Sequence, residues 1–157
     1  MNPSVDRPHM PGYGISDDPA GLLPWSHALA LLEKARTYWV ATCSPDGPHV
    51  AAVWGVWFDD ALCFSTGGRS RKARNLAADP RCSVAVPVRT DSDESVVLRG
   101  TARRLPVVPD GLAEAYVAKY GSGFPPVDES PLFAVSPETV IALTEDFTGQ
   151  ATRFRFP

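Results

Sequence analysis

Short apolar runs, each closed by a tight turn, follow one another through the first half of this sequence. The runs are TYWVATC (37–43), HVAAVWGVWF (49–58) and ALCFST (61–66), and the turns between them are SPDG (44–47) and DD (59–60). Runs of β-branched and aromatic residues separated by Asp, Gly and Pro predict strands joined as antiparallel hairpins. The middle run is almost wholly apolar, which predicts a strand with both faces covered.

Helix-like and strand-like patterns alternate along the rest of the chain. The predicted helices cover residues 24–36, 70–79 (apolar face Ala73, Leu76 and Ala77) and 110–120, and the predicted strands cover 82–88, 95–105, 138–146 and 150–156. Pro87 favours an edge or a bulge in its strand, and Gly100 predicts a bend. About six strands, mostly joined by short turns, predict a mainly β (α+β) fold: an antiparallel barrel with flanking helices.

The first 21 residues differ in composition from the rest. They carry four Pro and three Gly among polar residues. Such a segment buries too little apolar surface to offset its ordering entropy, so residues 1–21 are predicted to be a flexible arm, with wrapping of a partner subunit as the alternative. Residues 22–157 are then one domain, which suits a chain of 157 residues.

Charge and composition exclude several classes of protein. The formal net charge is −3, which disfavours general binding to nucleic acid or anionic membranes. No apolar run approaches the length of a membrane span. The three cysteines stand far apart within apolar runs, which favours reduced thiols and a cytoplasmic protein. The three histidines show no metal-ligand spacing, so no metal is expected.

One segment, FSTGGRSRKARNL (64–76), concentrates positive charge on this acidic chain. Two glycines follow a predicted strand, and a helix begins near Ser70 with four cations within six residues, Arg69, Arg71, Lys72 and Arg74. Basic side chains at a helix N-terminus oppose the helix dipole, whereas free N–H groups there bind anions. The segment predicts a phosphate site with help from the Thr66 hydroxyl; the alternative is a solvated basic helix face.

The order of these elements resembles the pyridoxamine 5′-phosphate oxidase-like family of flavin and deazaflavin split barrels. The matching stretch is VATCSPDGPHVAAVWGVWFDDALCFSTGGRSRKARNLAADPRCSVAV (40–86), followed by VVLRGTARRL (96–105). The resemblance implies an antiparallel split β-barrel. It also implies a cofactor phosphate held by Ser70, Arg71 and Lys72, with Ser65 and Thr66 at the end of the preceding strand.

In that family the cofactor ring lies along the strand that here covers residues 50–57. The resemblance therefore places Val53, Trp54 and Gly55 beside the ring. Gly55 either lets a planar ring approach closely or marks a bulge. Trp54 and Trp57 are three residues apart in a strand and point to opposite faces, so one of them is predicted to lie in the core.

The sequence departs from the pyridoxamine phosphate oxidases themselves. Residues 50–57 contain no basic side chain, and the last residues, TRFRFP, contain no histidine. The pattern looks more like short actinobacterial members of the family, many of which resemble users of the deazaflavin coenzyme F420. F420, with its phosphate and acidic tail, is therefore slightly favoured over FMN.

The resemblance implies an oxidoreductase that transfers a hydride between the bound cofactor and an unsaturated small-molecule substrate. It also implies a homodimer with the cofactor between subunits, where Arg153 or Arg155 could reach a neighbour's cofactor. No catalytic side chain is identified: His49 is interpreted as structural, and Tyr116 and Tyr120 as a packing stripe. The alternatives are a non-catalytic FMN-, F420- or haem-binding module and, disfavoured by charge, a nucleic-acid contact through the basic cluster.

Overall fold

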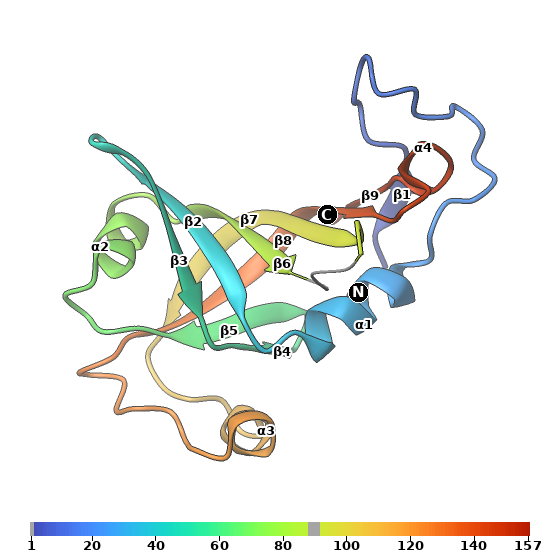
Figure 1. Ribbon diagram of the computed structural model, residues 1–157. Coiled ribbons are helices and arrows are strands. Elements are labelled where there is room, and N and C mark those ends of the chain that lie inside the picture. The colour runs from blue at the N-terminus through green and yellow to red at the C-terminus, as the bar shows by residue number, and fades with distance from the viewer. Residues whose placement is uncertain (1, 88–91) are drawn as a thin grey trace.

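The computed structural model describes residues 2–87 and 92–157. In chain order the elements are β1 (Ser4–Asp6), α1 (Trp25–Lys34), β2 (Tyr38–Ser44), β3 (Gly47–Val53), β4 (Val56–Phe58), β5 (Ala61–Ser65), α2 (Arg71–Ala78), β6 (Arg81–Pro87), β7 (Ser95–Leu105), α3 (Leu112–Tyr120), β8 (Leu132–Leu143), α4 (Phe147–Gln150) and β9 (Thr152–Arg155) (Figure 1). None of the helices among these residues is long and apolar enough to cross a membrane.

The strands form one curved antiparallel sheet in the order β1-β9-β8-β7-β6-β2-β3, with β5 pairing β8 and β4. The first part of β8 pairs with β5, and its last part pairs with β9. This change of partner lets the sheet curl back on itself, and the predicted antiparallel, mainly β architecture is confirmed.

A bend in β7 makes this curl possible. The register between β7 and β8 shifts between Arg99 and Gly100, and a Cβ on Gly100 would overlap the Ser136 carbonyl oxygen. Only glycine fits there, which confirms the predicted bend.

Both predicted hairpins are present. Ser44 pairs with Gly47 at the end of β2 and β3, and Phe58 pairs with Ala61 across a two-residue loop. The loop residues Asp59 and Asp60 have φ of 50° and 57°. Asp tolerates this left-handed conformation, which the twist of a two-residue hairpin requires.

The interior of the sheet holds the main core, closed at one side by α1. Trp25 of α1 packs edge-on against Phe154 and Phe156, with ring centroids 5.3 and 5.0 Å apart. A smaller cluster lies under α3, where Leu112 and Tyr116 pack on residues of β4, β5 and β8. The largest fully buried side chains are Tyr38, Phe64, Phe154, Leu32, Leu62, Leu98, Leu112 and Leu132.

Several strands differ from the prediction in residue range or in burial. The structure describes nine strands rather than about six, because the apolar run 49–58 is split into β3 and β4 and because β1 pairs with β9. The expectation that both faces of this run are covered is wrong: Val50 is 57% exposed, because β3 pairs only with β2 among the described residues and its outer face is open.

Strands β6, β8 and β9 correct three further expectations. Strand β6 lies between β2 and β7 rather than at an edge, and Pro87 is its last residue, paired only with Ser95; Val88 lies outside the described residues. Strand β8 begins at Leu132 rather than at Glu138. The final strand begins at Thr152, since the preceding residues form the short helix α4.

The N-terminal segment packs against the C-terminal end of the chain. β1 pairs with β9, and the Arg7 guanidinium donates to the carbonyl oxygens of Asp18 (2.6 Å), Ala20 (2.7 Å) and Ala151 (3.0 Å). Residues 2–21 therefore have defined contacts with the barrel, Met1 lies outside the described residues, and the flexibility of the arm stays a prediction.

Candidate cofactor-binding site

The turn between β5 and α2 brings two hydroxyl groups together. Strand β5 ends at Ser65, and Ser70 caps α2: its Oγ accepts a hydrogen bond from the Ala73 N–H at 3.2 Å. The Thr66 Oγ1 lies 3.2 Å from the Ser70 Oγ. Each hydroxyl has one proton to donate, so the pair can present a donor beside the free N–H groups of the helix end.

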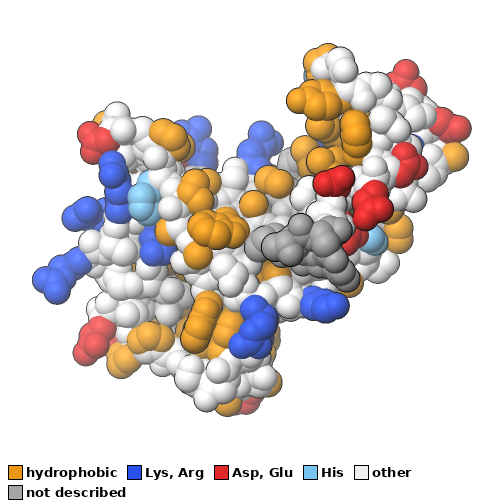
Figure 2. All heavy atoms as spheres, viewed as in Figure 1, with side chains coloured by type: hydrophobic (Ala, Val, Ile, Leu, Met, Phe, Trp, Pro, Cys, Tyr) orange, Lys and Arg blue, Asp and Glu red, His pale blue; other side chains and the backbone are white. Residues whose placement is uncertain are grey.

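The same helix end concentrates positive charge. Arg69, Arg71 and Arg74 are exposed and Lys72 is half-buried, and the first turn of α2 holds no acidic residue. An anion placed here would meet both the helix dipole and these side chains. Figure 2 shows Lys and Arg side chains gathered on the side of the molecule where α2 and the β2–β3 turn lie.

One carboxylate faces this charge. Asp46, in the β2–β3 turn, lies with its Oδ2 3.4 Å from Nη2 of Arg71. Both side chains are solvent-exposed, and an exposed pair of this kind contributes little to stability. Arg71 therefore remains able to exchange Asp46 for a ligand phosphate.

A buried hydrogen bond fixes α2 on the sheet. The Asn75 Nδ2 donates to the Thr42 Oγ1 of β2 at 3.0 Å, and both residues are buried. Ala73 and Leu76 lie in the core as predicted, whereas Ala77 is exposed and Asn75 takes its place on the buried face. Sequence reasoning missed Asn75, although a poor helix former in the middle of a helix is a signal for a specific contact.

The connection between β3 and β4 forms the second part of the site. Val53 is buried, whereas Trp54 is 55% exposed and stacks on Tyr120 of α3, with ring centroids 4.9 Å apart and planes 5° apart. Trp57 lies in the core, so the two tryptophans separate as their spacing predicts.

Gly55 lies where the chain leaves β3 and enters β4. A Cβ at this position would lie 2.9 Å from both the Cys63 carbonyl oxygen and the Leu62 Cδ1. The missing side chain is therefore explained by the close approach of β5, and the strand is interrupted here. The approach of a ring to Gly55 stays a prediction.

The end of α3 holds this connection in place. The Gly55 N–H donates to the Tyr120 hydroxyl at 3.0 Å, and this hydroxyl lies 2.8 Å from the Gly55 carbonyl oxygen and 2.7 Å from that of Arg36. The Lys119 Nζ donates to the carbonyl oxygens of Glu33 and Gly55 and to the Tyr38 hydroxyl, at 3.0–3.1 Å. Tyr120 thus does more than pack, and sequence reasoning missed Lys119 altogether.

Burial changes the titration of these side chains. Desolvation lowers the pKa of Lys119 to about 8, and the nearby Arg36 acts in the same direction. Desolvation raises the pKa of Tyr38, whose hydroxyl donates to the Leu32 carbonyl oxygen at 2.5 Å. The network ties α1, α3 and the β3–β4 connection together.

Strand β3 links the two parts of the site. It starts beside the β2–β3 turn that faces Arg71 and ends next to Trp54.

His49 of β3 is in register with Thr42, so its side chain shares the face that α2 covers. The His49 Nδ1 is buried and has no hydrogen-bond partner among residues 2–87 and 92–157. Within the same ranges, no three His, Cys, Asp or Glu side chains are grouped to hold a metal ion.

A comparison with known protein families identifies the family of this chain. The sequence profile of pyridoxamine 5′-phosphate oxidase matches residues 25–144, which run from the start of α1 to just past the end of β8. The chain belongs to the pyridoxamine 5′-phosphate oxidase family. The predicted family and its split-barrel fold are thereby confirmed. A search of proteins with curated functions finds no match.

Solved structures with the same fold superpose on the chain. A conserved hypothetical protein from Mycobacterium tuberculosis is 20% identical with a TM-score of 0.68, covering 85% of this chain and 93% of that one. An F420 reductase is 28% identical with a TM-score of 0.56, covering 71% and 93%. A heme-binding protein from Mycobacterium smegmatis is 22% identical with a TM-score of 0.58, covering 78% and 55%. Proteins of this fold thus include one named as an F420 reductase and one named as a heme-binding protein.

Proposed function

We propose that this protein is an F420- or FMN-dependent oxidoreductase, with F420 favoured, whose cofactor phosphate binds at the N-terminus of α2. The observation that carries the proposal is the grouping of the Thr66 and Ser70 hydroxyls with Arg71 and Lys72 on a helix end that lacks an acidic residue. Ser65 closes the preceding strand at the same place.

The likeness to an F420 reductase at 28% identity supports the deazaflavin. The four cations at the start of α2 suit a ligand with more than one negative charge, because each guanidinium or ammonium adds attraction. Strand β3 offers a path for the ring from this helix end toward Val53, Trp54 and Gly55. The Trp54 side chain is exposed and its ring stacks on Tyr120, so it can limit where a flat cofactor ring lies.

When bound, the cofactor would supply hydride transfer to or from an unsaturated small molecule. The chain's own residues would bind the phosphate, orient the ring along β3 and shield it from water. No side chain is assigned as a proton donor.

We further propose that the protein is a homodimer with the cofactor at the interface. The outer face of the sheet exposes Trp39, Val50 and Val97, although these are large apolar side chains. Ala85 pairs with both Trp39 and Val97, so the apolar side chains continue across β2, β6 and β7. A contiguous exposed apolar surface of this kind suits association with a second copy.

The proposal is tested by titrating the purified protein with FMN and with F420 in parallel, read by fluorescence. One of the two is expected to bind, and Arg71→Ala and Lys72→Ala are each expected to weaken binding by about 1.5–3 kcal/mol, as for hydrogen bonds to charged groups. Arg103→Ala, an exposed arginine on β7, is the matched control and should leave binding unchanged. Binding of neither cofactor, or equal binding in all variants, would contradict the proposal. Tight binding without reduction of any acceptor would instead favour a non-catalytic binding module.

A further inference from the structure

The C-terminal end of α3 holds a charged side chain that the proposed chemistry does not use. Lys119 is half-buried, and its Nζ donates to the Glu33 carbonyl oxygen of α1 at 3.1 Å and to the Tyr38 hydroxyl of β2 at 3.0 Å. Its third hydrogen bond, at 3.1 Å, goes to the Gly55 carbonyl oxygen in the β3–β4 connection. In Figure 1, α3 lies below β4 and the C-terminal end of α1. One ammonium group thus joins three parts of the chain to α3.

The Tyr120 hydroxyl serves the same backbone. It accepts from the Gly55 N–H at 3.0 Å, and it lies within reach of two carbonyl oxygens, those of Arg36 (2.7 Å) and Gly55 (2.8 Å). A phenol has one proton to donate, so it satisfies one of these oxygens at a time. The Lys119 ammonium supplies Gly55 with a donor of its own, which leaves the Tyr120 proton for Arg36.

The donors and acceptors of this network balance when Lys119 is charged. Tyr38 gives its own proton to the Leu32 carbonyl oxygen, so toward Lys119 its hydroxyl oxygen is an acceptor. Three protons on the ammonium and one on Tyr120 then meet four acceptor oxygens, which belong to Glu33, Arg36, Tyr38 and Gly55. A neutral amine has one proton fewer, so one of these oxygens loses its donor.

The groups that face Lys119 bring its titration close to neutral pH. Burial lowers the pKa of Lys119 to about 8, and the Arg36 guanidinium acts in the same direction, whereas the Glu33 carboxylate of α1 opposes the shift. Burial also raises the pKa values of Tyr38 and Tyr120, so both phenols keep their protons where Lys119 loses its own. The β3–β4 connection contributes a carbonyl oxygen and no titratable group. Lys119 is therefore the member of this network that changes charge.

The position of Trp54 depends on this network. Trp54 and Gly55 lie between β3 and β4, outside both strands, whereas Glu33 and Tyr38 are held by α1 and β2. We propose that Lys119 is a positioning residue for the cofactor ring: its ammonium holds Gly55, and with it the exposed Trp54 indole, where the ring requires them, and loss of its proton releases them. This role rests on the proposed cofactor site and makes ring binding depend on pH. A ligand that selects the held form binds less tightly once the proton is lost.

The first experiment follows Trp54 in the full-length protein without cofactor. The protein is labelled with 5-fluorotryptophan, and the Trp54 fluorine signal, assigned with Trp54→Phe, is recorded from about pH 7 to 9.5. In the wild type the signal is expected to shift with a midpoint near pH 8. Lys34→Met, at an exposed lysine of α1, should give the same shift, and Lys119→Met should lack it. A Trp54 signal that does not titrate, or that titrates equally in Lys119→Met, overturns the proposal.

The second experiment measures the affinity for F420 or FMN, whichever binds, over the same pH range. Near pH 7 the wild type is expected to bind roughly two- to tenfold more tightly than Lys119→Met, the scale of one hydrogen bond. This ratio should approach one near pH 9.5, and the ligand's own ionisation cancels in it. Lys119→Gln, a polar neutral replacement, should give the same profile, and Lys34→Met should match the wild type at every pH.

The two experiments separate the role of Lys119 from the proposed function. Tight binding of one cofactor with a ratio that stays constant across the pH range would refute the role of Lys119 and leave the cofactor site standing. Binding of neither cofactor would contradict the proposed function and, with it, the effect on the ring, even where the Trp54 signal titrates.

Discussion

Gly55 shows how a single residue positions the candidate site. Its N–H and carbonyl are both hydrogen-bonded to the end of α3, and β5 passes so close that a side chain has no room. The position of Trp54 therefore depends on contacts made by its neighbour. A change that moves Gly55 is expected to move Trp54 as well.

Gly55→Ala is predicted to destabilise the fold. The added methyl would lie 2.9 Å from the backbone oxygen of Cys63 and from the Leu62 side chain, and relieving such overlaps costs about 1–3 kcal/mol. The measurement is the midpoint of urea unfolding. Gly123→Ala is the control, since a Cβ there meets nothing within 4 Å and should leave stability unchanged or slightly raised. Equal midpoints for Gly55→Ala and the wild type would show that β5 can move away from the added methyl group with no loss of stability.

Lys119 is predicted to make stability depend on pH. Its pKa is about 8 in the folded protein against an ordinary 10.5, because burial disfavours the charge. Between these values the unfolded chain binds more protons than the folded one, so this residue's contribution to the free energy of unfolding rises from pH 8 to 10.5 and is constant below about pH 7.

The comparison with Lys119→Met isolates this effect. Buried Cys63 and Cys82, whose pKa values are raised, act in the opposite direction at high pH, but they are the same in both proteins. Tyr38 contacts Lys119, and its raised pKa keeps its hydroxyl protonated in both folded proteins over this range. The stability of the wild type relative to Lys119→Met, from urea unfolding at several pH values, should therefore increase between pH 8 and 10. Parallel curves for the two proteins would refute the depressed pKa.

At the residue scale, spacing predicted that Trp54 and Trp57 separate, but Trp54 lies in the connection between β3 and β4, so alternation within one strand is not the whole reason. It could not predict the contacts of Lys119 and Tyr120. Those residues lie 64 or more positions from Gly55 and meet it only through the packing of α3. A helix pattern indicates which face is apolar and leaves the partners of its polar atoms open.

Among the elements, α2 depends on one buried polar contact. The predicted effect of Asn75→Ala is a loss of about 1–3 kcal/mol in the free energy of unfolding, because the Thr42 hydroxyl would remain buried without its partner. Asn75→Ala combined with Thr42→Val should cost less than the sum of the two single changes. The measurement is a double-mutant cycle by urea unfolding. Additive losses would mean that the two side chains do not depend on each other.

At the element scale, turn chemistry was predictable and strand surroundings were not. The Pro-Asp and Asp-Asp loops locate the two hairpins, since few residues adopt the required backbone conformations. The apolar composition of β3 gave the wrong expectation of burial on both faces. An apolar side chain such as Val50 is equally compatible with a core and with an interface, and the sequence of one chain does not separate them.

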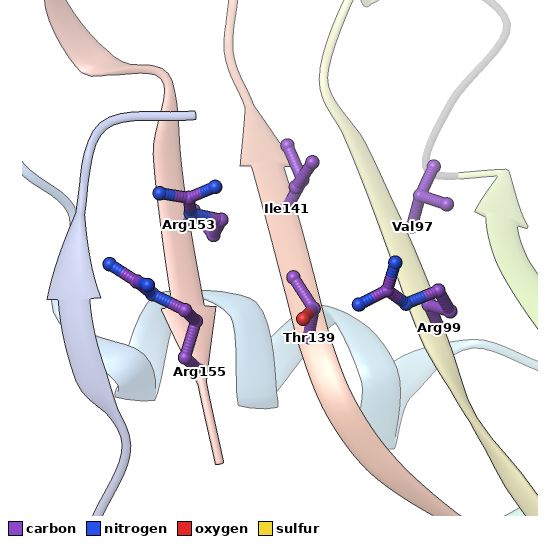
Figure 3. A pocket seen from close by; sticks show the side chains of 6 residues that line it. All are labelled: Val97, Arg99, Thr139, Ile141, Arg153 and Arg155. Atoms are coloured by element: carbon purple, nitrogen blue, oxygen red, sulfur yellow. The ribbon is translucent and has the colours of Figure 1, made fainter. Parts of the chain in front are cut away.

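At the scale of the whole molecule, closure of the barrel depends on β8 pairing with three other strands. Gly100 signalled a bend, but pairing partners are long-range properties that periodicity does not encode. Strand order predicted a barrel and the basic segment predicted a phosphate site; the family resemblance added the split-barrel topology and gave Ser70, Arg71 and Lys72 the role of holding a cofactor phosphate. The grouping of Arg99, Arg153 and Arg155 on one face (Figure 3) depends on the register of β7, β8 and β9, which local patterns do not give.

The proposed homodimer gives a prediction at this largest scale. Trp39 stands in the middle of the apolar outer face, paired with Ala52 on one side and Ala85 on the other. Trp39→Glu would place a charge in an interface that excludes water, so the protein is expected to sediment as a folded monomer, whereas the wild type sediments as a dimer. Val107→Glu, which puts the same charge at an exposed loop residue, should stay dimeric. If the cofactor lies between subunits, the monomeric variant should also bind F420 or FMN more weakly at unchanged circular dichroism. A monomeric wild type, or a Trp39→Glu variant that remains dimeric, would assign this apolar face to another partner.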